Sequence, residues 1–249
     1  MTDLHGMIAL VTGASSGIGE GTARQLAKAG VTVGLVARRK DRLETLKASI
    51  EADGGTARVF VADVTNVAEL KDAAQALRDE FGSVDVLFNN AGIMPISDID
   101  EFKTDEWDQM VDINIKGVLN GIAAVLPIMI EQHSGHIFNI SSIAGRRVFG
   151  QGFSVYSATK FAVSALSEGL RMEVGGKHNI RVTTIDPGQV STELLEGTSN
   201  EELKATIREA GADVKMVQPS ELGEAVVFAL QAPEHVNLAN LFILPTSQA

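Results

Sequence analysis

MIALVTGASSGIGE, residues 7 to 20, joins an apolar run to a turn with three glycines. Residues 7–12 have the composition of a buried strand, and Gly13, Gly17 and Gly19 follow directly. Glycines allow a sharp turn and a close approach of backbone amides to a pyrophosphate, and the dipole of the following helix favours anions. The spacing is G-x3-G-x-G rather than G-x-G-x-x-G, so the flanking strand and helix support the interpretation. We interpret the stretch as a dinucleotide-binding turn, with a purely structural turn as the alternative.

The same alternation of apolar runs and amphipathic segments continues along the chain. Runs rich in Val and Ile predict strands at 7–12, 31–37, 57–63, 84–90, 136–142, 180–186 and 238–244. Helical periodicity marks the segments between them, at 17–29, 40–52, 66–81, 104–132, 155–175 and 219–231. Such alternation implies right-handed crossovers. We therefore predict an α/β fold with a single domain over 1–249 and a doubly wound parallel sheet of about seven strands, with helices on both faces.

One long segment interrupts this alternation. Residues 188–218 contain no predicted strand, begin as GQVSTELLEG and continue as a charged, helix-like stretch. Insertions of this length are often mobile lids over a site, and we expect such a lid here. A surface helix without a function is the alternative.

Charge and composition restrict the classes of partner. The 32 acidic and 21 basic residues give a net charge of -11, which opposes binding to nucleic acid or to anionic membranes. The first residues carry no basic region typical of a secretory signal, and the apolar stretch 117–130 is shorter than the ~20 residues that a membrane span needs. We therefore expect a cytoplasmic protein. The chain has no Cys, and its five His are scattered, so we expect no metal site.

The end of the second predicted strand indicates the type of dinucleotide. An acidic residue usually stands there and binds the ribose 2′-hydroxyl, but this chain has Ala37, Arg38 and Arg39. A guanidinium binds a 2′-phosphate through charge-assisted hydrogen bonds. We therefore favour NADP(H) over NAD(H), with Arg38 as the main phosphate ligand, Arg39 assisting and Ser15 contributing its hydroxyl. A solvated helix start is the alternative for these arginines.

Two residues four positions apart suggest acid–base chemistry. Tyr156 is the only tyrosine of the chain, and on a helix it shares a face with Lys160. A phenol with a pKa of about 10 is a poor base at neutral pH, but an ammonium at ~4 Å and an effective dielectric of ~20 contributes about 4 kcal/mol toward ionisation. We therefore expect Lys160 to lower the pKa of Tyr156, which would then donate and accept a proton.

Three further polar residues belong near this pair or near the cofactor. Ser142 ends a predicted strand at the carboxyl edge of the sheet, where it would orient a substrate oxygen. Asn114 would hold a water that links Lys160 to solvent, or would satisfy the backbone as a buried amide. Asp63 would accept a hydrogen bond from adenine, or would form a turn or helix cap.

Together these pieces resemble the short-chain dehydrogenase/reductase family, in its group of about 250 residues that favours NADP(H). The motifs occur in the expected order over nearly the whole chain. They are TGASSGIG (12–19), DV (63–64), NNAG (89–92), N-x-x-G (114–117), SSIAG (141–145), YSATK (156–160) and PG-x-V-x-T (187–192). The final LFILPTSQA is closest to the branch of clavulanic-aldehyde reductases and 3-hydroxy acid dehydrogenases.

The resemblance implies a single-domain Rossmann fold and assigns residue roles. The catalytic tetrad would be Asn114, Ser142, Tyr156 and Lys160. The cofactor would be held by Gly13, Ser15, Ser16, Gly17, Ile18, Gly19, Ala37, Arg38, Arg39, Asp63, Val64, Asn90, Ala91, Gly92, Tyr156, Lys160, Pro187, Gly188, Val190 and Thr192. A homotetramer or a homodimer would be the assembly.

The resemblance further implies reversible hydride transfer between NADP(H) and a ketone or aldehyde, as in alcohol dehydrogenases and carbonyl reductases. The expected substrate pocket is lined by Met94, Ile96, Ile143, Val148, Phe149, Phe153, Gln189, Leu194 and Leu195, any of which could instead be ordinary core. Ser142 lies fourteen positions before Tyr156, where thirteen is commoner, so the loop 145–155 has one extra residue. In that loop we expect Phe149 and Phe153 to select the substrate. Arg146 and Arg147 would attract a carboxylate substrate or lie exposed. A non-catalytic NADP(H) sensor or scaffold is the second hypothesis.

Overall fold

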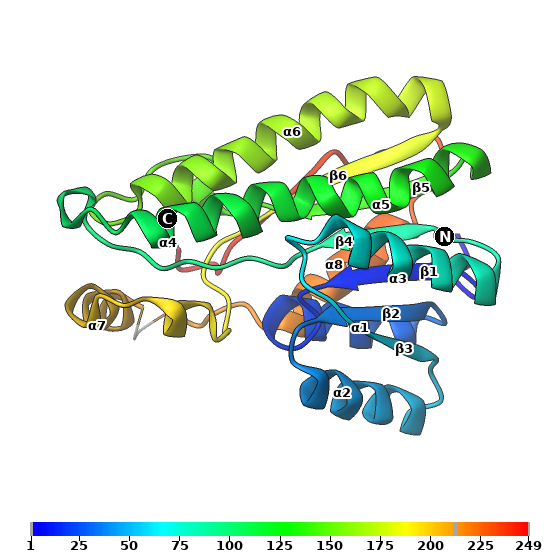
Figure 1. Ribbon diagram of the computed structural model, residues 1–249, viewed down its shortest axis with the longest axis horizontal. Coiled ribbons are helices and arrows are strands. Elements are labelled where there is room, and N and C mark those ends of the chain that lie inside the picture. The colour runs from blue at the N-terminus through cyan, green and yellow to red at the C-terminus, as the bar shows by residue number, and fades with distance from the viewer. Residues whose placement is uncertain (1, 212–213, 249) are drawn as a thin grey trace.

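The computed structural model describes residues 2–211 and 214–248, which contain a seven-stranded parallel sheet (Figure 1). The strands lie in the order β3-β2-β1-β4-β5-β6-β7. Their bounds are β1 Ile8–Thr12, β2 Thr32–Ala37, β3 Ala57–Val61, β4 Val86–Asn89, β5 Gly135–Ile140, β6 Ile180–Pro187 and β7 Asn240–Ile243. The strand order reverses between β1 and β4, so the crevice where such sheets bind ligands opens at the carboxyl ends of these two strands.

Helices cover both faces of the sheet. Their bounds are α1 Gly17–Lys28, α2 Lys40–Ala52, α3 Val67–Phe81, α4 Thr104–Val111, α5 Gly117–Gln132, α6 Ser154–His178, α7 Glu201–Ala210 and α8 Pro219–Leu230. One core joins α1, α2 and α8 to the sheet through side chains such as Leu26, Leu43 and Val226. The other joins α3, α5 and α6 through Leu70, Val125 and Val174. The predicted doubly wound α/β sheet is therefore confirmed.

Element boundaries differ from the prediction by a few residues. The largest difference is at the end of α6, predicted at 175 and observed at His178, and β7, predicted over 238–244, is observed at Asn240–Ile243. Among the described residues this edge strand pairs only with β6, and its residues alternate between exposed and partly buried, whereas an inner strand such as β1 is buried throughout. Because Pro245 has no N–H to donate to a neighbouring strand, the pairing also stops early.

The predicted helix 104–132 is continuous but contains a π-helical turn, Asp112–Lys116, between α4 and α5. Among the described residues, this single stretch, Thr104–Gln132, is long and apolar enough to cross a membrane, with a mean hydropathy of 1.7. Half of its most apolar window is buried inside the protein, where α5 packs against α3 and the sheet. The core helix of a soluble protein has the same length and composition.

The segment 188–218 leaves the sheet after β6 and returns to it before α8. Among its described residues it contains a 3-10 turn, Leu194–Gly197, and α7, and a bridge between Val190 and Val217 joins its two ends. The hydroxyl of Thr198 donates to the carbonyl oxygen of Met94 at 2.9 Å, and the hydroxyl of Ser199, just before α7, donates to Glu106 of α4 at 2.6 Å. The segment thus covers the carboxyl edge of the sheet, while its role as a lid stays a prediction.

Candidate active site

The glycine turn connects β1 to α1 at the crevice. Gly13 and Gly17 have φ of 65° and 55°, where a side chain would be strained. A Cβ on Gly13 would lie 2.7 Å from Nδ2 of Asn90, and one on Gly19 would lie 2.3 Å from the carbonyl oxygen of Gly13. Asn90 donates to the carbonyl oxygen of Thr12 at 3.1 Å, which ties the end of β4 to the turn. These glycines therefore leave the backbone of the turn without side chains, which close contact with a phosphate group requires.

Other predicted cofactor residues surround this turn. Ile18 packs on the core at the start of α1, while Ala37 and Val64 are buried at the ends of β2 and after β3. Ala91 donates its backbone N–H to Thr12 at 3.3 Å. The crevice is therefore walled by short or apolar side chains.

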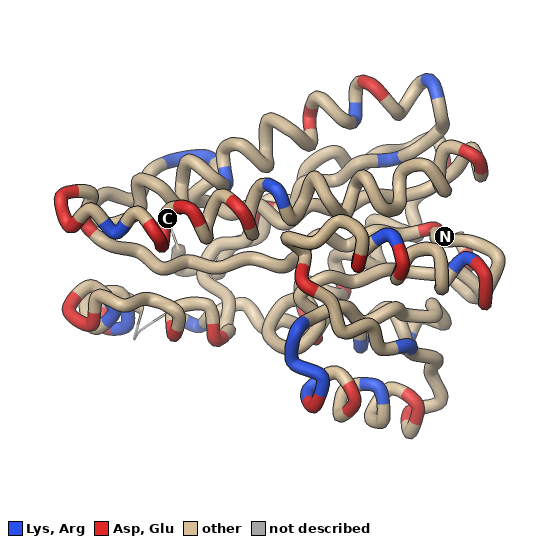
Figure 2. Tube along the Cα trace, in the orientation of Figure 1, with Lys and Arg blue, Asp and Glu red and all other residues tan. Residues whose placement is uncertain are grey.

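Basic side chains gather where β2 passes into α2 (Figure 2). Arg39 donates to Ser15 at 2.9 Å and to Ser16 at 2.7 Å, so it lies over the glycine turn. Arg38 extends into solvent and approaches a carboxylate oxygen of Asp63 at 3.7 Å. In the protein alone, Arg39 and not Arg38 therefore contacts Ser15 and Ser16, which the sequence predicts as cofactor-binding residues.

Asp63 has the turn role that the sequence left open. Its carboxylate accepts from the backbone N–H and the hydroxyl of Thr65, at 2.9 and 2.8 Å. Burial opposes ionisation, but these hydrogen bonds and the charge of Arg38 hold the pKa of Asp63 below its usual value. The cap of α3 is Asn66, whose side chain accepts from Ala68. Asp63 is therefore ionised and forms a turn, and its adenine contact stays a prediction.

Ser142, Tyr156 and Lys160 meet at the carboxyl edge between β5 and α6. Ser142 caps a 3-10 turn, and its oxygen accepts from the N–H of Ala144 at 3.0 Å. The hydroxyl of Tyr156 is hydrogen-bonded to Ser142. Lys160 donates to the carbonyl oxygen of Ile140 at 3.0 Å, and its nitrogen lies 5.7 Å from the centre of the Tyr156 ring. The predicted shared face of one helix is therefore present.

The pKa values of this pair differ from the expectation. Burial raises the pKa of Tyr156 to about 12, which the hydrogen bond with Ser142 only partly offsets. Burial lowers the pKa of Lys160 to about 8, although the charge of Asp186 opposes this change. The predicted lowering of the Tyr156 pKa is wrong for the protein alone, because burial disfavours the phenolate more than the hydrogen bond with Ser142 favours it. At neutral pH Tyr156 is therefore a protonated phenol.

Asn114 lies in the π-helical turn between α4 and α5 and is buried. Its amide donates to the carbonyl oxygen of Ile93 at 3.0 Å and accepts from the N–H of Ile93 at 2.9 Å. A Cβ on Gly92 would lie 3.3 Å from Oδ1 of Asn114 and 3.6 Å from the nitrogen of Lys160. The alternative of a buried amide that satisfies the backbone is therefore observed, beside Lys160.

The segment after β6 lies across the crevice from β1. Pro187 ends β6, and the N–H of Gly188 donates to the carbonyl oxygen of Ile243 at 2.8 Å. Val190 pairs with Val217, and the methyl group of Thr192 lies 3.1 Å from the position of a Cβ on Gly17. The structure therefore brings this predicted segment onto the glycine turn.

The predicted pocket residues separate into two sets. Met94, Ile96, Phe153 and Leu195 join Tyr156 in one apolar cluster, which Leu203 of α7 completes. The ring of Phe153 meets Tyr156 edge-on at 6.5 Å and lies 6.0 Å from the ring of Phe149. The structure does not place the remaining residues in that cluster. These are Ile143, buried in its own turn; Val148, Phe149 and Leu194, exposed; and Gln189, whose backbone N–H bonds to Gln248.

Three functional candidates were not found by reasoning from the sequence. Arg42 and Glu193 form an ion pair at 2.8 Å beside Arg39, and Asp186 is buried against Arg146 at 2.6 Å. Arg146 is exposed, as one of its two predicted alternatives states, but its guanidinium is paired with Asp186 and is therefore not a free ligand for a carboxylate. Helical spacing after the Arg38–Arg39 pair could have indicated Arg42. Glu193 and Asp186 pair with residues far along the chain, and no local pattern indicates such pairs.

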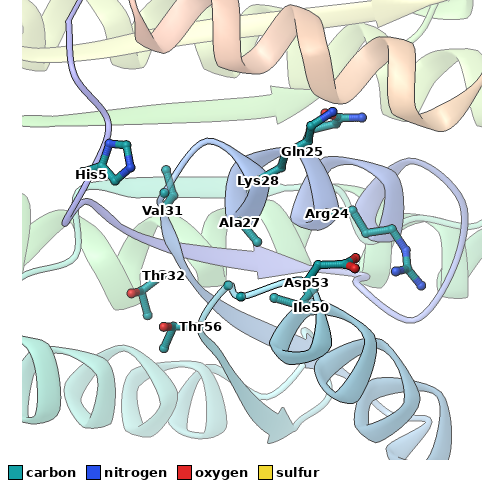
Figure 3. A pocket seen from close by; sticks show the side chains of 13 residues that line it. His5, Arg24, Gln25, Ala27, Lys28, Val31, Thr32, Ile50, Asp53 and Thr56 are labelled. Carbon is teal, nitrogen blue, oxygen red and sulfur yellow. The ribbon is translucent and has the colours of Figure 1, made fainter.

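A hollow of about 670 Å³ lies elsewhere, at the amino ends of β2 and β3 between α1 and α2 (Figure 3). His5, Arg24, Lys28 and Asp53 are among its lining residues. Arg24 is already engaged by Glu20 at 2.9 Å. In α/β sheets of this type the ligand binds at the carboxyl ends of the strands, so we assign no catalytic role to this hollow. The described residues contain no group of three or more His, Asp or Glu that could hold a metal ion.

Similarity to known proteins extends over the whole chain. Residues 7–203 match the family model of the short chain dehydrogenases. The chain is 43% identical over 252 residues to an uncharacterized oxidoreductase of Staphylococcus saprophyticus, with 100% of each chain covered. A serine dehydrogenase complexed with NADP+ is similar with a TM-score of 0.88 and 34% identity, over 98% of this chain and 96% of that chain. An alcohol dehydrogenase of the archaeon Thermococcus sibiricus, complexed with 5-hydroxy-NADP, is similar with a TM-score of 0.85 and 28% identity, over 98% of each chain.

Proposed function

The chain belongs to the short-chain dehydrogenase family of oxidoreductases, and from that premise we propose that it interconverts a ketone or aldehyde and an alcohol with NADP(H). The observation that supports this reaction is the buried group of Ser142, Tyr156 and Lys160, in which the phenol is hydrogen-bonded to the serine and the ammonium lies on the same helix face. Such a group holds a proton where a carbonyl oxygen would need one.

The residues around the crevice fit the proposed cofactor. Bare glycines at the start of α1 suit a pyrophosphate, and the guanidinium groups of Arg38, Arg39 and Arg42 suit a 2′-phosphate. An adjacent acid would repel that phosphate, but the end of β2 carries none. We assign the nicotinamide half to Asn90–Gly92 and Pro187–Thr192, with Lys160 at its ribose. When bound, the cofactor supplies a hydride to the carbonyl carbon.

The protonation state of Tyr156 suits the reductive direction. With a pKa of about 12 the phenol is neutral at pH 7, and in this form it can donate its proton to a carbonyl oxygen. Ser142 donates a hydrogen bond to the same oxygen and fixes its position. Alcohol oxidation instead requires the phenolate, and a positive charge at ~4 Å with a dielectric of ~20 stabilises it by about 4 kcal/mol. A cationic nicotinamide together with Lys160 can provide that charge.

Lys160 and Asn114 would return the proton to Tyr156. Lys160 has a pKa of about 8, so it exchanges protons readily near neutral pH. Asn114 holds the Ile93 backbone and faces Lys160 across Gly92, which has no side chain to fill the space between them. We assign to Asn114 the support of a water-mediated path from that space to solvent.

We also propose a homotetramer, or a homodimer, in the cytoplasm. Exposed apolar side chains on α4, α5, α6 and β7 support self-association, because packing against a second subunit would remove their apolar surface from water. They are Val111, Leu119, Phe161, Met172 and Phe242. Light scattering of the purified protein gives the oligomeric state directly.

A panel of ketones and aldehydes assayed with NADPH tests the proposed reaction. We expect turnover for at least one apolar carbonyl compound, since Phe153, Ile96 and Met94 line the space beside Tyr156. The second candidate, a non-catalytic NADP(H) sensor or scaffold, predicts tight NADPH binding without turnover across the panel. The intact serine, tyrosine and lysine favour the enzyme.

A further inference from the structure

Glu193 lies between two arginines at the entrance of the crevice. Its carboxylate accepts from Arg42 at 2.8 and 3.0 Å and from Arg39 at 3.4 Å. Arg39 in turn donates to Ser15 and Ser16 of the glycine turn. A carboxylate from residues 188–218 therefore occupies a site made of two guanidinium groups, one of which also binds two serine hydroxyls.

The neighbouring residue fixes the position of this carboxylate. The methyl group of Thr192 lies 3.1 Å from where a Cβ on Gly17 would be, so the chain at 192–193 passes directly over the glycine turn. The Arg42 guanidinium lowers the pKa of Glu193, with a smaller contribution from Arg39, and Glu193 is therefore fully ionised at neutral pH.

We propose that Glu193 occupies in the free protein the arginine site that the 2′-phosphate of NADP(H) takes in the complex, and thereby limits the preference for NADPH over NADH. This inference rests on the proposed function, because it assumes that the arginines at the start of α2 bind the 2′-phosphate. Glu193 is thus a specificity-determining residue that acts by competition rather than by contact with the cofactor.

The physical argument is the difference in charge between the competitors. A phosphate monoester carries more negative charge than a carboxylate at neutral pH and offers three acceptor oxygens, so it displaces Glu193 from Arg39 and Arg42. The displacement costs little free energy, because the side chains of Arg39, Arg42 and Glu193 are about half exposed and solvent screens their attraction. NADH has a neutral hydroxyl at this position and leaves the Glu193 pairs in place.

Glu193→Gln tests the proposal through cofactor binding. We expect the Kd of NADPH, measured by fluorescence titration, to fall about three- to tenfold, as the loss of a screened competing charge allows. The Kd of NADH should stay unchanged, and 2′-AMP should bind more tightly to the variant by a factor similar to that of NADPH. Glu196→Gln is the matched control, because Glu196 lies in the same segment but pairs with Lys204 and Arg208.

Four results would contradict the inference. Unchanged or weaker NADPH binding by Glu193→Gln overturns it, as does an equal gain for NADPH and NADH, or an equal gain in the control. If one of these results is found and the wild type still binds NADPH, the inference is overturned and the proposed function is not affected. A wild type that does not bind NADPH overturns both. Glu193 is half exposed and outside the core, so the variant should keep the wild-type Tm, which circular dichroism checks.

Discussion

The nitrogen of Lys160 lies 5.7 Å from the centre of the Tyr156 ring, and both side chains are only 5% exposed. Burial favours the uncharged form of each residue, so it raises the pKa of the Tyr156 phenol and lowers the pKa of the Lys160 ammonium. The free protein therefore holds a neutral acid beside a cation that is easily deprotonated. Binding of a positively charged ring would move Tyr156 toward its phenolate, so under the proposed function the free protein suits reduction and the complex with an oxidised cofactor suits alcohol oxidation.

Tyr156→Phe should abolish most turnover and leave NADPH binding nearly unchanged. The substitution removes the hydroxyl that is bonded to Ser142 and keeps the ring that packs on Phe153. Loss of a general acid typically lowers kcat by about 10²- to 10⁴-fold. Steady-state kinetics and fluorescence titration of NADPH measure the two quantities. Retention of more than about a tenth of the wild-type kcat would refute the acid–base role.

Lys160→Met should remove a pH dependence of stability. The folded-state pKa of Lys160 is about 8 and its ordinary value is 10.5, so between these pH values the unfolded chain binds the proton more strongly. The wild type should therefore gain stability as pH rises, by about 2 kcal/mol relative to the variant between pH 8 and pH 9.5. Urea denaturation at several pH values measures it, with Lys177→Met, exposed on the same helix, as the control. A constant difference between wild type and Lys160→Met would contradict the assigned pKa.

The sequence was sufficient for the parts of this structure that depend on local patterns. Buried parallel strands read as continuous apolar runs, and the glycine turn follows one of them, so the sheet and its crevice are predicted from residues 7–20 outward. Tyr156 and Lys160 share a face because four residues make about one helical turn. The ends of β7 and the π-helical turn at Asn114 have no such pattern.

Electrostatic relationships across the fold could not be predicted in the same way. The pKa of Tyr156 depends on how completely α6 and the 94–96 segment exclude water, which no spacing shows. Glu193 reaches Arg42 across 151 residues of sequence, and Asp186 reaches Arg146 across 40. The sequence therefore predicted which groups lie together at the candidate site, but not the burial and the ion pairs around them.

Arg39→Ala should raise the KM for NADPH far more than the KM for NADH. Arg39 contacts Ser15 and Ser16 over the glycine turn, and loss of a charge-assisted contact with a phosphate costs about 1.5–3 kcal/mol, or roughly ten- to hundredfold. Arg38→Ala should act in the same direction, and the comparison shows which arginine is the main ligand. Initial-rate kinetics with both cofactors measure the effect. Equal changes in the two KM values would count against a phosphate site.

Phe153→Ala should widen the substrate range. The ring of Phe153 lies edge-on to Tyr156 at 6.5 Å and packs against the neighbouring Phe149. Its removal opens space next to the reacting hydroxyl, so kcat/KM should rise for bulky ketones relative to small ones. Removing an aromatic contact can alter discrimination by about 1–3 kcal/mol. Val148→Ala, at an exposed position of the same loop, is the control, and an unchanged ratio in Phe153→Ala would exclude this residue from the pocket.

Arg146→Met should destabilise the fold through Asp186. The Asp186 carboxylate is 2% exposed, accepts from Arg146 at 2.6 Å and from Asn240 at 2.7 Å, and has a second oxygen with no hydrogen-bond partner among the described residues. Without the guanidinium a buried charge is left poorly compensated, which costs about 3–5 kcal/mol for a fully buried pair and about 2 kcal/mol here, because Arg146 is half exposed.

Asp186→Asn in the same chain should restore most of that loss, since it removes the charge. Urea denaturation of both variants and of Arg171→Met, which breaks an exposed pair with Glu168, measures the coupling. Additive losses in the double variant would mean that Arg146 acts only by packing on Phe242, over whose ring it lies at 4.5 Å.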